Sequence, residues 1–129
     1  MLARLRKSEN SEAGFTLIEL LVVIIIIGIL AAIAIPTFLN QRKKGWVSAI
    51  KSDLHNAAIA EESYATDNNG AYLSGTNGAI TGFNPSANVT TVAAATGTTS
   101  YTLTGSNSAF TGCSIVFSSS TGQSVATGC

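Results

Sequence analysis

The carboxyl-terminal half of this 129-residue chain has no charged side chain, because all seven Lys/Arg and all seven Asp/Glu residues lie between Arg4 and Asp67. Phosphate recognition draws its affinity from Lys and Arg, so a nucleic-acid-compacting or basic phosphate-binding domain is hard to reconcile with residues 68–129. Half of these residues are Ser, Thr or Gly, and apolar residues occur there in short clusters. We therefore expect a small core at most.

Groups that carry out catalysis or bind metals are also scarce. The chain has one histidine, His55, and two cysteines, Cys113 and Cys129. Two sulfurs and a distant imidazole are too few ligands for a typical zinc site, and neither Ser nor Cys stands beside His55 as an evident nucleophile. The sequence therefore predicts a protein that is not an enzyme and uses no metal or cofactor, with His55 in a structural role.

The longest apolar stretch runs from Phe15 to Ile35 and is interrupted by Thr16 and Glu19 alone. A helix of this length, at about 1.5 Å per residue, spans roughly 30 Å, the thickness of a bilayer's hydrocarbon core. The stretch is apolar on all sides, so we expect it in lipid or among copies of itself. Three basic residues precede it and three follow it, so the positive-inside rule favours a cytoplasmic amino terminus only slightly.

The residues after Pro36 recover a helical period. Val47, Ile50, Leu54, Ala57, Ala58 and Tyr64 fall near one face. We expect one helix from about residue 15 to about residue 65, kinked at Pro36 and ended by the turn-forming residues 67–70. The β-favouring stretches that follow are 89–92, 100–104, 113–117 and 124–127.

The predicted fold is therefore α+β. A long kinked amino-terminal helix has an apolar half for a membrane or a filament core and an amphipathic half. The amphipathic half packs on a small carboxyl-terminal antiparallel sheet of three or four strands.

The segment Gly14-Phe15-Thr16-Leu17-Ile18-Glu19 combines a glycine junction, an aromatic residue that opens the apolar run, and a carboxylate five residues into that run. This segment and the apolar sequence after it resemble the type IV pilin signature, which type II secretion pseudopilins share. The resemblance covers roughly residues 14–65. It implies that a membrane aspartyl protease cuts after Gly14 and methylates the new amine of Phe15.

The resemblance also implies an organisation in four parts. These are a leader that is removed (1–14), a transmembrane or filament-core helix (15–36), an amphipathic helix half (37–66) and a Ser/Thr/Gly-rich β domain with a carboxyl-terminal disulfide loop (67–129).

Glu19 is the one carboxylate inside the apolar run. A charge at such a depth costs on the order of 2 to 3 kcal/mol on insertion scales and is usually paired. After cleavage the nearby cation is the Phe15 amine, either of the same chain, four residues away, or of a neighbouring subunit, as the resemblance implies. A hydrated carboxylate near the helix end is the alternative.

Gly28 and Pro36 weaken the helix between them. The resemblance implies that this stretch unwinds in a filament, whereas a kink with ordinary close packing is the alternative. Cys113 and Cys129 would close a loop worth about 3 kcal/mol as a disulfide, and two free thiols are the alternative. Pilins commonly carry such a carboxyl-terminal disulfide loop.

The sequence thus predicts a structural subunit, a type IV pilin, and the uncharged sheet favours a major subunit. Its precursor would be a single-pass protein of the cytoplasmic membrane with a cytoplasmic amino terminus, later polymerised into a homo-oligomeric helical filament on the cell surface. The implied partners are the prepilin peptidase/methyltransferase, the pilus assembly machinery and, before assembly, the lipid bilayer.

Three other interpretations remain open. The chain could be the major pseudopilin of a type II secretion or DNA-uptake system, a secreted adhesive module cut by signal peptidase after Ala34, or a plain one-pass anchor. Arg42, Lys43 and Lys44 are expected near phosphate headgroups, with DNA as a less supported partner. Candidate glycosylation sites are Asn88 in the triplet Asn88-Val89-Thr90, and the hydroxyls of Ser119 and Ser120.

Overall fold

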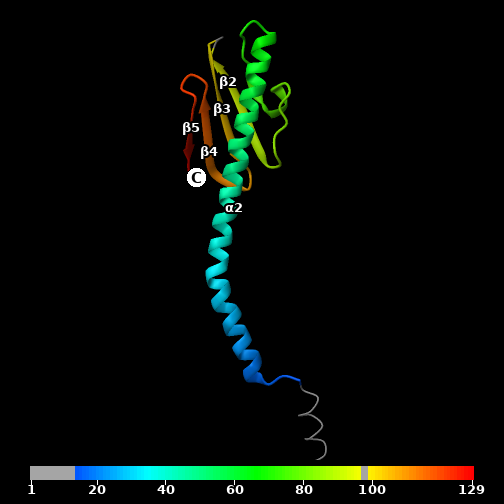
Figure 1. Cartoon of the computed structure of the whole chain (residues 1–129), viewed down its shortest axis with the longest axis vertical. Coiled ribbons are helices and arrows are strands. Elements are labelled where there is room, and N and C mark those ends of the chain that lie inside the picture. Colours follow the sequence, from blue (N-terminus) through cyan, green and yellow to red (C-terminus); the bar gives the residue numbers. More distant parts are fainter. Residues whose placement is uncertain (1–13, 97–98) are drawn as a thin grey trace, which may run out of the picture. The chain divides into compact units, whose positions relative to one another are not determined.

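The computed structural model describes residues 14–96 and 99–129, so the expected leader lies outside the described residues except for Gly14. The contacts divide the chain into two units, residues 1–40 and residues 41–129. The elements in chain order are helix α2 (Leu17–Asp67), β1 (Gly75–Thr76), the short 3-10 helix η1 (Asn77–Ala79), β2 (Val89–Thr96), β3 (Ser100–Asn107), β4 (Phe110–Ser118) and β5 (Gln123–Thr127) (Figure 1).

Helix α2 confirms the long helix that the sequence predicts. Pro36 lies inside it, and the helix continues although proline supplies no N–H for the ladder. Next to it, the Thr37 hydroxyl donates a hydrogen bond to the Ile33 carbonyl at 3.0 Å. The helix ends where turn residues were expected: Asn69 and Gly70 have φ of 54° and 84°, in the left-handed region that closes helices.

The five strands form one antiparallel sheet in the order β1-β2-β3-β4-β5, so each strand pairs with its sequence neighbour. The antiparallel sheet is confirmed, but the predicted number of three or four strands is wrong. The missed strand, β1, has two residues, and two residues cannot show the alternation by which strands are recognised. It forms because Gly75 pairs with Ala93 and Thr76 with Val92 of β2.

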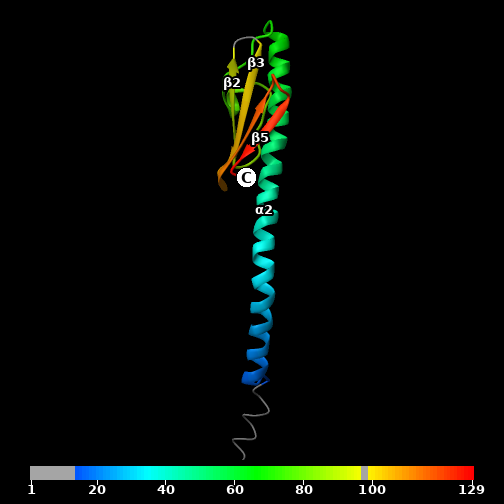
Figure 2. The same ribbon diagram turned by 90° about the vertical axis from the view of Figure 1, so that its left-hand side faces the viewer.

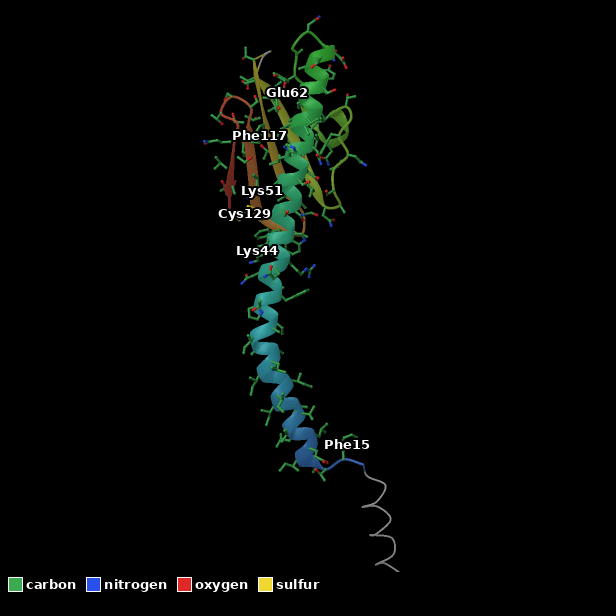
Figure 3. All side chains as sticks on the ribbon, viewed as in Figure 1. Phe15, Lys44, Lys51, Glu62, Phe117 and Cys129 are labelled. Carbon is green, nitrogen blue, oxygen red and sulfur yellow. A yellow bond between two sulfur atoms is a disulfide. The ribbon has the colours of Figure 1, made fainter. Side chains whose placement is uncertain are left out.

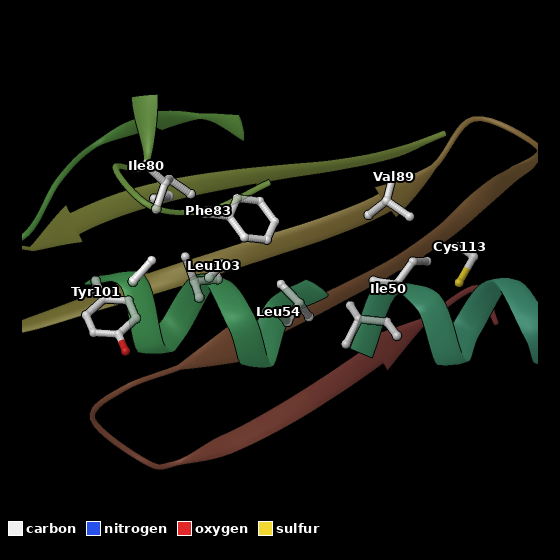
Figure 4. Packing of buried hydrophobic residues seen from close by; sticks show 12 residues of the cluster. Ile50, Leu54, Ile80, Phe83, Val89, Tyr101, Leu103 and Cys113 are labelled. Carbon is white, nitrogen blue, oxygen red and sulfur yellow. The ribbon is translucent and has the colours of Figure 1, made fainter. Parts of the chain in front are cut away.

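The sheet lies along the carboxyl-terminal half of α2, and the core is between them (Figures 1 and 2). Three residues of the predicted helix face, Ile50, Leu54 and Ala57, are buried, and the other three are half-buried. Strands contribute alternate side chains, as a sheet with one covered face requires. Figure 4 shows the resulting cluster, whose buried members are Ile50, Leu54, Ala57, Ala60, Ile80, Phe83, Val89, Ala93, Tyr101, Leu103, Cys113 and Ile115.

Candidate functional site

The apolar half of α2 exposes its hydrophobic side chains. Every large apolar residue from Phe15 to Leu39 is exposed, with exposed fractions between 47% for Leu39 and 88% for Leu17. Among the described residues, α2 is the one helix that is long and apolar enough to cross a membrane, and none of its apolar window is buried. A continuous apolar surface of this extent marks an interaction with lipid or with other protein chains.

Thr16 and Glu19 form a capping box at the start of α2. Glu19 Oε2 accepts hydrogen bonds from the Thr16 backbone N–H at 2.8 Å and from the Thr16 hydroxyl at 3.0 Å. Thr16 Oγ1 in turn accepts a hydrogen bond from the Glu19 N–H at 3.3 Å. The pattern Thr-x-x-Glu is a sequence signature of this arrangement, although the cap was not among the features predicted above.

The peptide between Gly14 and Phe15 precedes the helix. Both residues are exposed and outside any helix or strand, and the Phe15 side chain is 84% exposed. In the uncleaved chain the Phe15 nitrogen belongs to a peptide bond and carries no charge. The Glu19 carboxylate therefore has no charged Phe15 amine beside it, and it accepts hydrogen bonds from Thr16.

Gly28 and Pro36 both lie within α2, in its apolar half. A Cβ added to Gly28 would meet no atom within 4 Å outside the helix's own backbone. Nothing in the single chain therefore requires a glycine at this position.

A disulfide joins Cys113 and Cys129, with the two Cα atoms 4.7 Å apart. Cys113 is a buried member of the core cluster, whereas Cys129 is exposed. The bond ties β4 to the residues that follow β5. The backbones of the two neighbouring residues, Gly112 and Gly128, also lie close together, because a Cβ at Gly128 would collide with the Gly112 carbonyl oxygen.

Basic and aromatic side chains meet near the beginning of the second unit. The Arg42 guanidinium lies 5.1 Å from the centre of the Trp46 ring, and Lys43 Nζ lies 5.6 Å from the centre of the Phe110 ring. The two rings are 5.9 Å apart. Arg42 and Lys43 were predicted from the sequence to lie at an interface, whereas no sequence signal pointed to Phe110, which the β3–β4 turn brings to the helix.

Two carboxylates on α2 are buried, and the sequence analysis assigned a role to neither. Asp53 accepts hydrogen bonds from the backbone N–H of Ser86 at 2.7 Å and from its hydroxyl at 2.8 Å. Glu61 Oε2 accepts one from the Leu73 N–H at 3.0 Å, while Glu61 Oε1 has no partner among the described residues. Burial raises the pKa of the Glu61 carboxyl. Both carboxylates hold loops against the helix.

His55 and the candidate glycosylation residues do not come together in one site among the described residues. His55 is exposed on α2, and among the described residues no group of three or more His, Cys, Asp or Glu side chains could hold a metal ion. Asn88, Thr90 and Ser120 are exposed. The Ser119 hydroxyl, by contrast, accepts a hydrogen bond from the Tyr101 N–H at 2.8 Å. Glycosylation at these residues stays a prediction.

Comparison with known proteins assigns the amino-terminal segment to a known sequence motif. Residues 10–35 match the family model described as the prokaryotic N-terminal methylation motif. The chain is 47% identical over 60 residues to the type IV wide pilus major component of Thermus thermophilus, a match that covers 46% of each chain. It is 41% identical over 64 residues to the type IV major pilin protein of Myxococcus xanthus, covering 50% of this chain and 29% of the relative.

The chain thus carries the amino-terminal methylation motif and is similar to members of the type IV pilin superfamily. This superfamily also includes secretion proteins: the chain is 40% identical over 60 residues to type II secretion system core protein G of Pseudomonas aeruginosa, covering 46% of this chain and 42% of that protein. The matches span less than half the length of each of these three relatives. These relatives are named as structural filament and secretion components, not as enzymes.

Proposed function

We propose that this chain is a major pilin, polymerised through its apolar helix into a type IV pilus on the cell surface. The observation that carries the proposal is the exposure of every large apolar side chain from Phe15 to Leu39. In the precursor, lipid covers this surface; in the filament, the same segments of neighbouring copies cover it. Similarity to two relatives named as major pilus components supports the choice of a major subunit.

The precursor is a single-pass protein of the cytoplasmic membrane with residues 1–14 on the cytoplasmic side. Prepilin peptidase cuts after Gly14 and methylates the Phe15 amine. Exposure of both residues outside any helix or strand supports this step, because a protease needs an accessible, unfolded peptide. Residues 15–36 then serve as anchor and filament core, residues 37–66 as the amphipathic half, and residues 67–129 as the surface domain.

Cleavage changes the electrostatics around Glu19. The new Phe15 amine is a cation, and in an apolar surrounding the carboxylate gains from pairing with it. Glu19 then neutralises the Phe15 amine of a neighbouring subunit and sets the register in which the pilus assembly machinery adds that subunit.

Gly28 and Pro36 have their roles in the packed filament, in close helix packing and in local unwinding of the helix. The free space around Gly28 in the single chain supports a role that arises only between chains, where a glycine allows close approach. The helix between Gly28 and Pro36 unwinds in the filament, since glycine and proline both lower helix stability.

The second candidate is a major pseudopilin of a type II secretion or DNA-uptake system. Its support is the similarity to core protein G, which is 40% identical to this chain over 60 residues. Binding of DNA through Arg42 and Lys43 has less support, because both cations lie over aromatic rings. A secreted module cut after Ala34 has less support too, because Ala34 lies in the interior of α2.

The test is the intact mass and amino-terminal sequence of the protein from sheared cell-surface material. The pilin proposal expects an N-methylated Phe15 start and a mass two hydrogens below that of the reduced chain. A start at Ile35 overturns it in favour of a secreted module, and an uncut Met1 confined to membranes overturns it in favour of a plain anchor. Processed protein that never reaches the surface, with secretion lost on gene deletion, favours the pseudopilin.

A further inference from the structure

The exposed face of α2 carries a charged stripe. Lys44, Lys51, His55 and Glu62 are all exposed and are spaced by seven, four and seven residues. At 3.6 residues per turn these four positions lie within about 20° of one line along the helix. Figure 3 shows Lys44, Lys51 and Glu62 following one another along α2. The stripe is basic at its amino-terminal end and acidic at its carboxyl-terminal end.

Among the residues that the structure describes, the charged side chains of the stripe make no ion pair with a group of opposite sign. Neither lysine has an acidic residue three or four positions away, and Glu62 has no basic one, so helical pairs of the usual spacing are absent. Residues 68–129 carry no charged side chain that could reach across. Within residues 14–96 and 99–129, the Glu62 carboxylate accepts a long hydrogen bond from the Tyr72 hydroxyl at 3.5 Å and makes no ion pair.

We propose that the stripe is a contact between subunits, in which Glu62 of one copy pairs with Lys44 or Lys51 of a second copy of this chain. The inference rests on the proposed function, because a filament supplies the second copy. All copies enter the membrane with the same chain end, so neighbouring helices are parallel. Parallel copies at the same height would put like charges side by side, which is unfavourable.

A displacement along the axis converts this repulsion into attraction. Lys51 precedes Glu62 by eleven residues and Lys44 precedes it by eighteen. A parallel copy shifted by about 16 Å brings Lys51 level with Glu62, and one shifted by about 27 Å brings Lys44 level with it. Ile59, 57% exposed and next to the stripe, adds apolar area to the same contact.

The experiment reverses these charges in the full chain, produced in its own cells, and measures the yield of sheared filaments against the amount of precursor in the membrane. We expect Glu62→Lys alone to lower the yield about tenfold, since like charges then face each other. The same loss is expected from the reversal of the lysine that makes the contact, either Lys51→Glu or Lys44→Glu. Combining Glu62→Lys with the correct lysine reversal is expected to restore the yield, and the combination that does so fixes the displacement.

Two variants serve as matched controls. Lys51→Arg keeps the charge and is expected to leave the yield unchanged. Ser63→Lys adds a cation about 100° around the helix from Glu62 and is expected to change the yield less than about twofold. If a reversed variant fails to accumulate in the membrane, Glu62→Gln replaces Glu62→Lys, because it removes the charge without adding one, and it is expected to lower the yield about threefold.

The outcomes separate the inference from the proposed function. Absence of filaments from the unmodified chain overturns the proposed function itself. Normal filaments from the unmodified chain, together with reversals that have no effect, overturn the inference alone. Two double variants that both stay as low as the single ones, with normal precursor levels, also overturn it.

Discussion

Gly105 of β3 lies directly against Ile50 of α2: a Cβ added to Gly105 would fall 2.6 Å from Ile50 Cγ2 and 3.2 Å from two atoms of Leu54. Gly105 is buried and its φ is not positive, so the glycine is needed for space rather than for backbone conformation. The missing side chain lets the helix approach the middle of the sheet.

Substitution of Gly105 by alanine should therefore destabilise the second unit. Overpacking of a filled core costs about 1 to 3 kcal/mol, and Ile50→Leu, which removes the Cγ2 branch that the new Cβ would meet, should recover part of that loss. The free energy of unfolding by urea, measured on the full chain in detergent, checks both. Ser106→Ala, at the exposed neighbouring position, is the control. A Gly105→Ala variant as stable as the unmodified chain would contradict this packing.

The buried carboxyl of Glu61 makes stability depend on pH. Burial raises the pKa of this group in the folded state above its ordinary value of 4.5. Below about pH 4.5 the group is protonated in both states and has no effect on stability; as the pH rises towards the folded pKa, the unfolded state loses its proton first. The free energy of unfolding should therefore fall with rising pH in this window.

Glu61→Gln should remove this contribution, because the amide stays neutral at every pH and can still accept the hydrogen bond from the Leu73 N–H. The midpoint of thermal unfolding, followed from pH 4 to pH 8, checks it. Glu62→Gln changes the exposed neighbour and should leave most of the slope in place. An unchanged slope in the Glu61 variant would show that the pH dependence comes from elsewhere.

Local patterns in the sequence were sufficient for the helix and most of the sheet. The apolar run, the period through Ile50 and Leu54, and the turn at Asn69 and Gly70 predict α2 to within about two residues at each end. Each of these signals depends on residues close together in the chain. The four longer strands were found in the same way.

Apart from the Thr16–Glu19 capping box, which is a local pattern, the missed contacts of the candidate site depend on residues far apart in sequence. Asp53 bonds to Ser86, 33 positions later, and Lys43 lies over Phe110. An acidic residue on a helix is ordinarily solvated, so nothing in the local sequence distinguishes the buried Asp53 and Glu61 from the exposed Glu62. Only the folded loops reveal which carboxylates they cover.

The Cys113–Cys129 disulfide should contribute much of the stability of the second unit. Closing a loop of this size stabilises by about 3 kcal/mol in the loop-entropy model, and the core is small. Replacing both cysteines by serine should lower the free energy of unfolding by roughly that amount. Thermal unfolding with and without a reducing agent checks it: the agent should lower the midpoint of the unmodified chain and leave that of the double variant unchanged. Equal midpoints for the unmodified chain and the double variant, both measured without reducing agent, would contradict a stabilising role for the disulfide.

Glu19 has one observed role, in the helix cap, and one proposed role, in assembly, and substitution of Thr16 separates them. Its carboxylate caps α2 through Thr16, and in the proposed filament it pairs with the Phe15 amine of a neighbour. Thr16→Ala removes the hydroxyl bonds of the cap, which costs about 1 kcal/mol of helix stability, but keeps the carboxylate, so filaments should still form.

Glu19→Ala removes both tasks. It should reduce filament yield to below about a tenth, because the Phe15 amine is then left unpaired in an apolar surrounding. The second unit should stay folded, since residues 41–129 contain its whole core. Sheared filament yield, together with oxidation of the Cys113–Cys129 pair as a measure of folding, checks both variants. If Thr16→Ala lost as much filament as Glu19→Ala, the geometry of the cap rather than the charge of Glu19 would be what assembly requires.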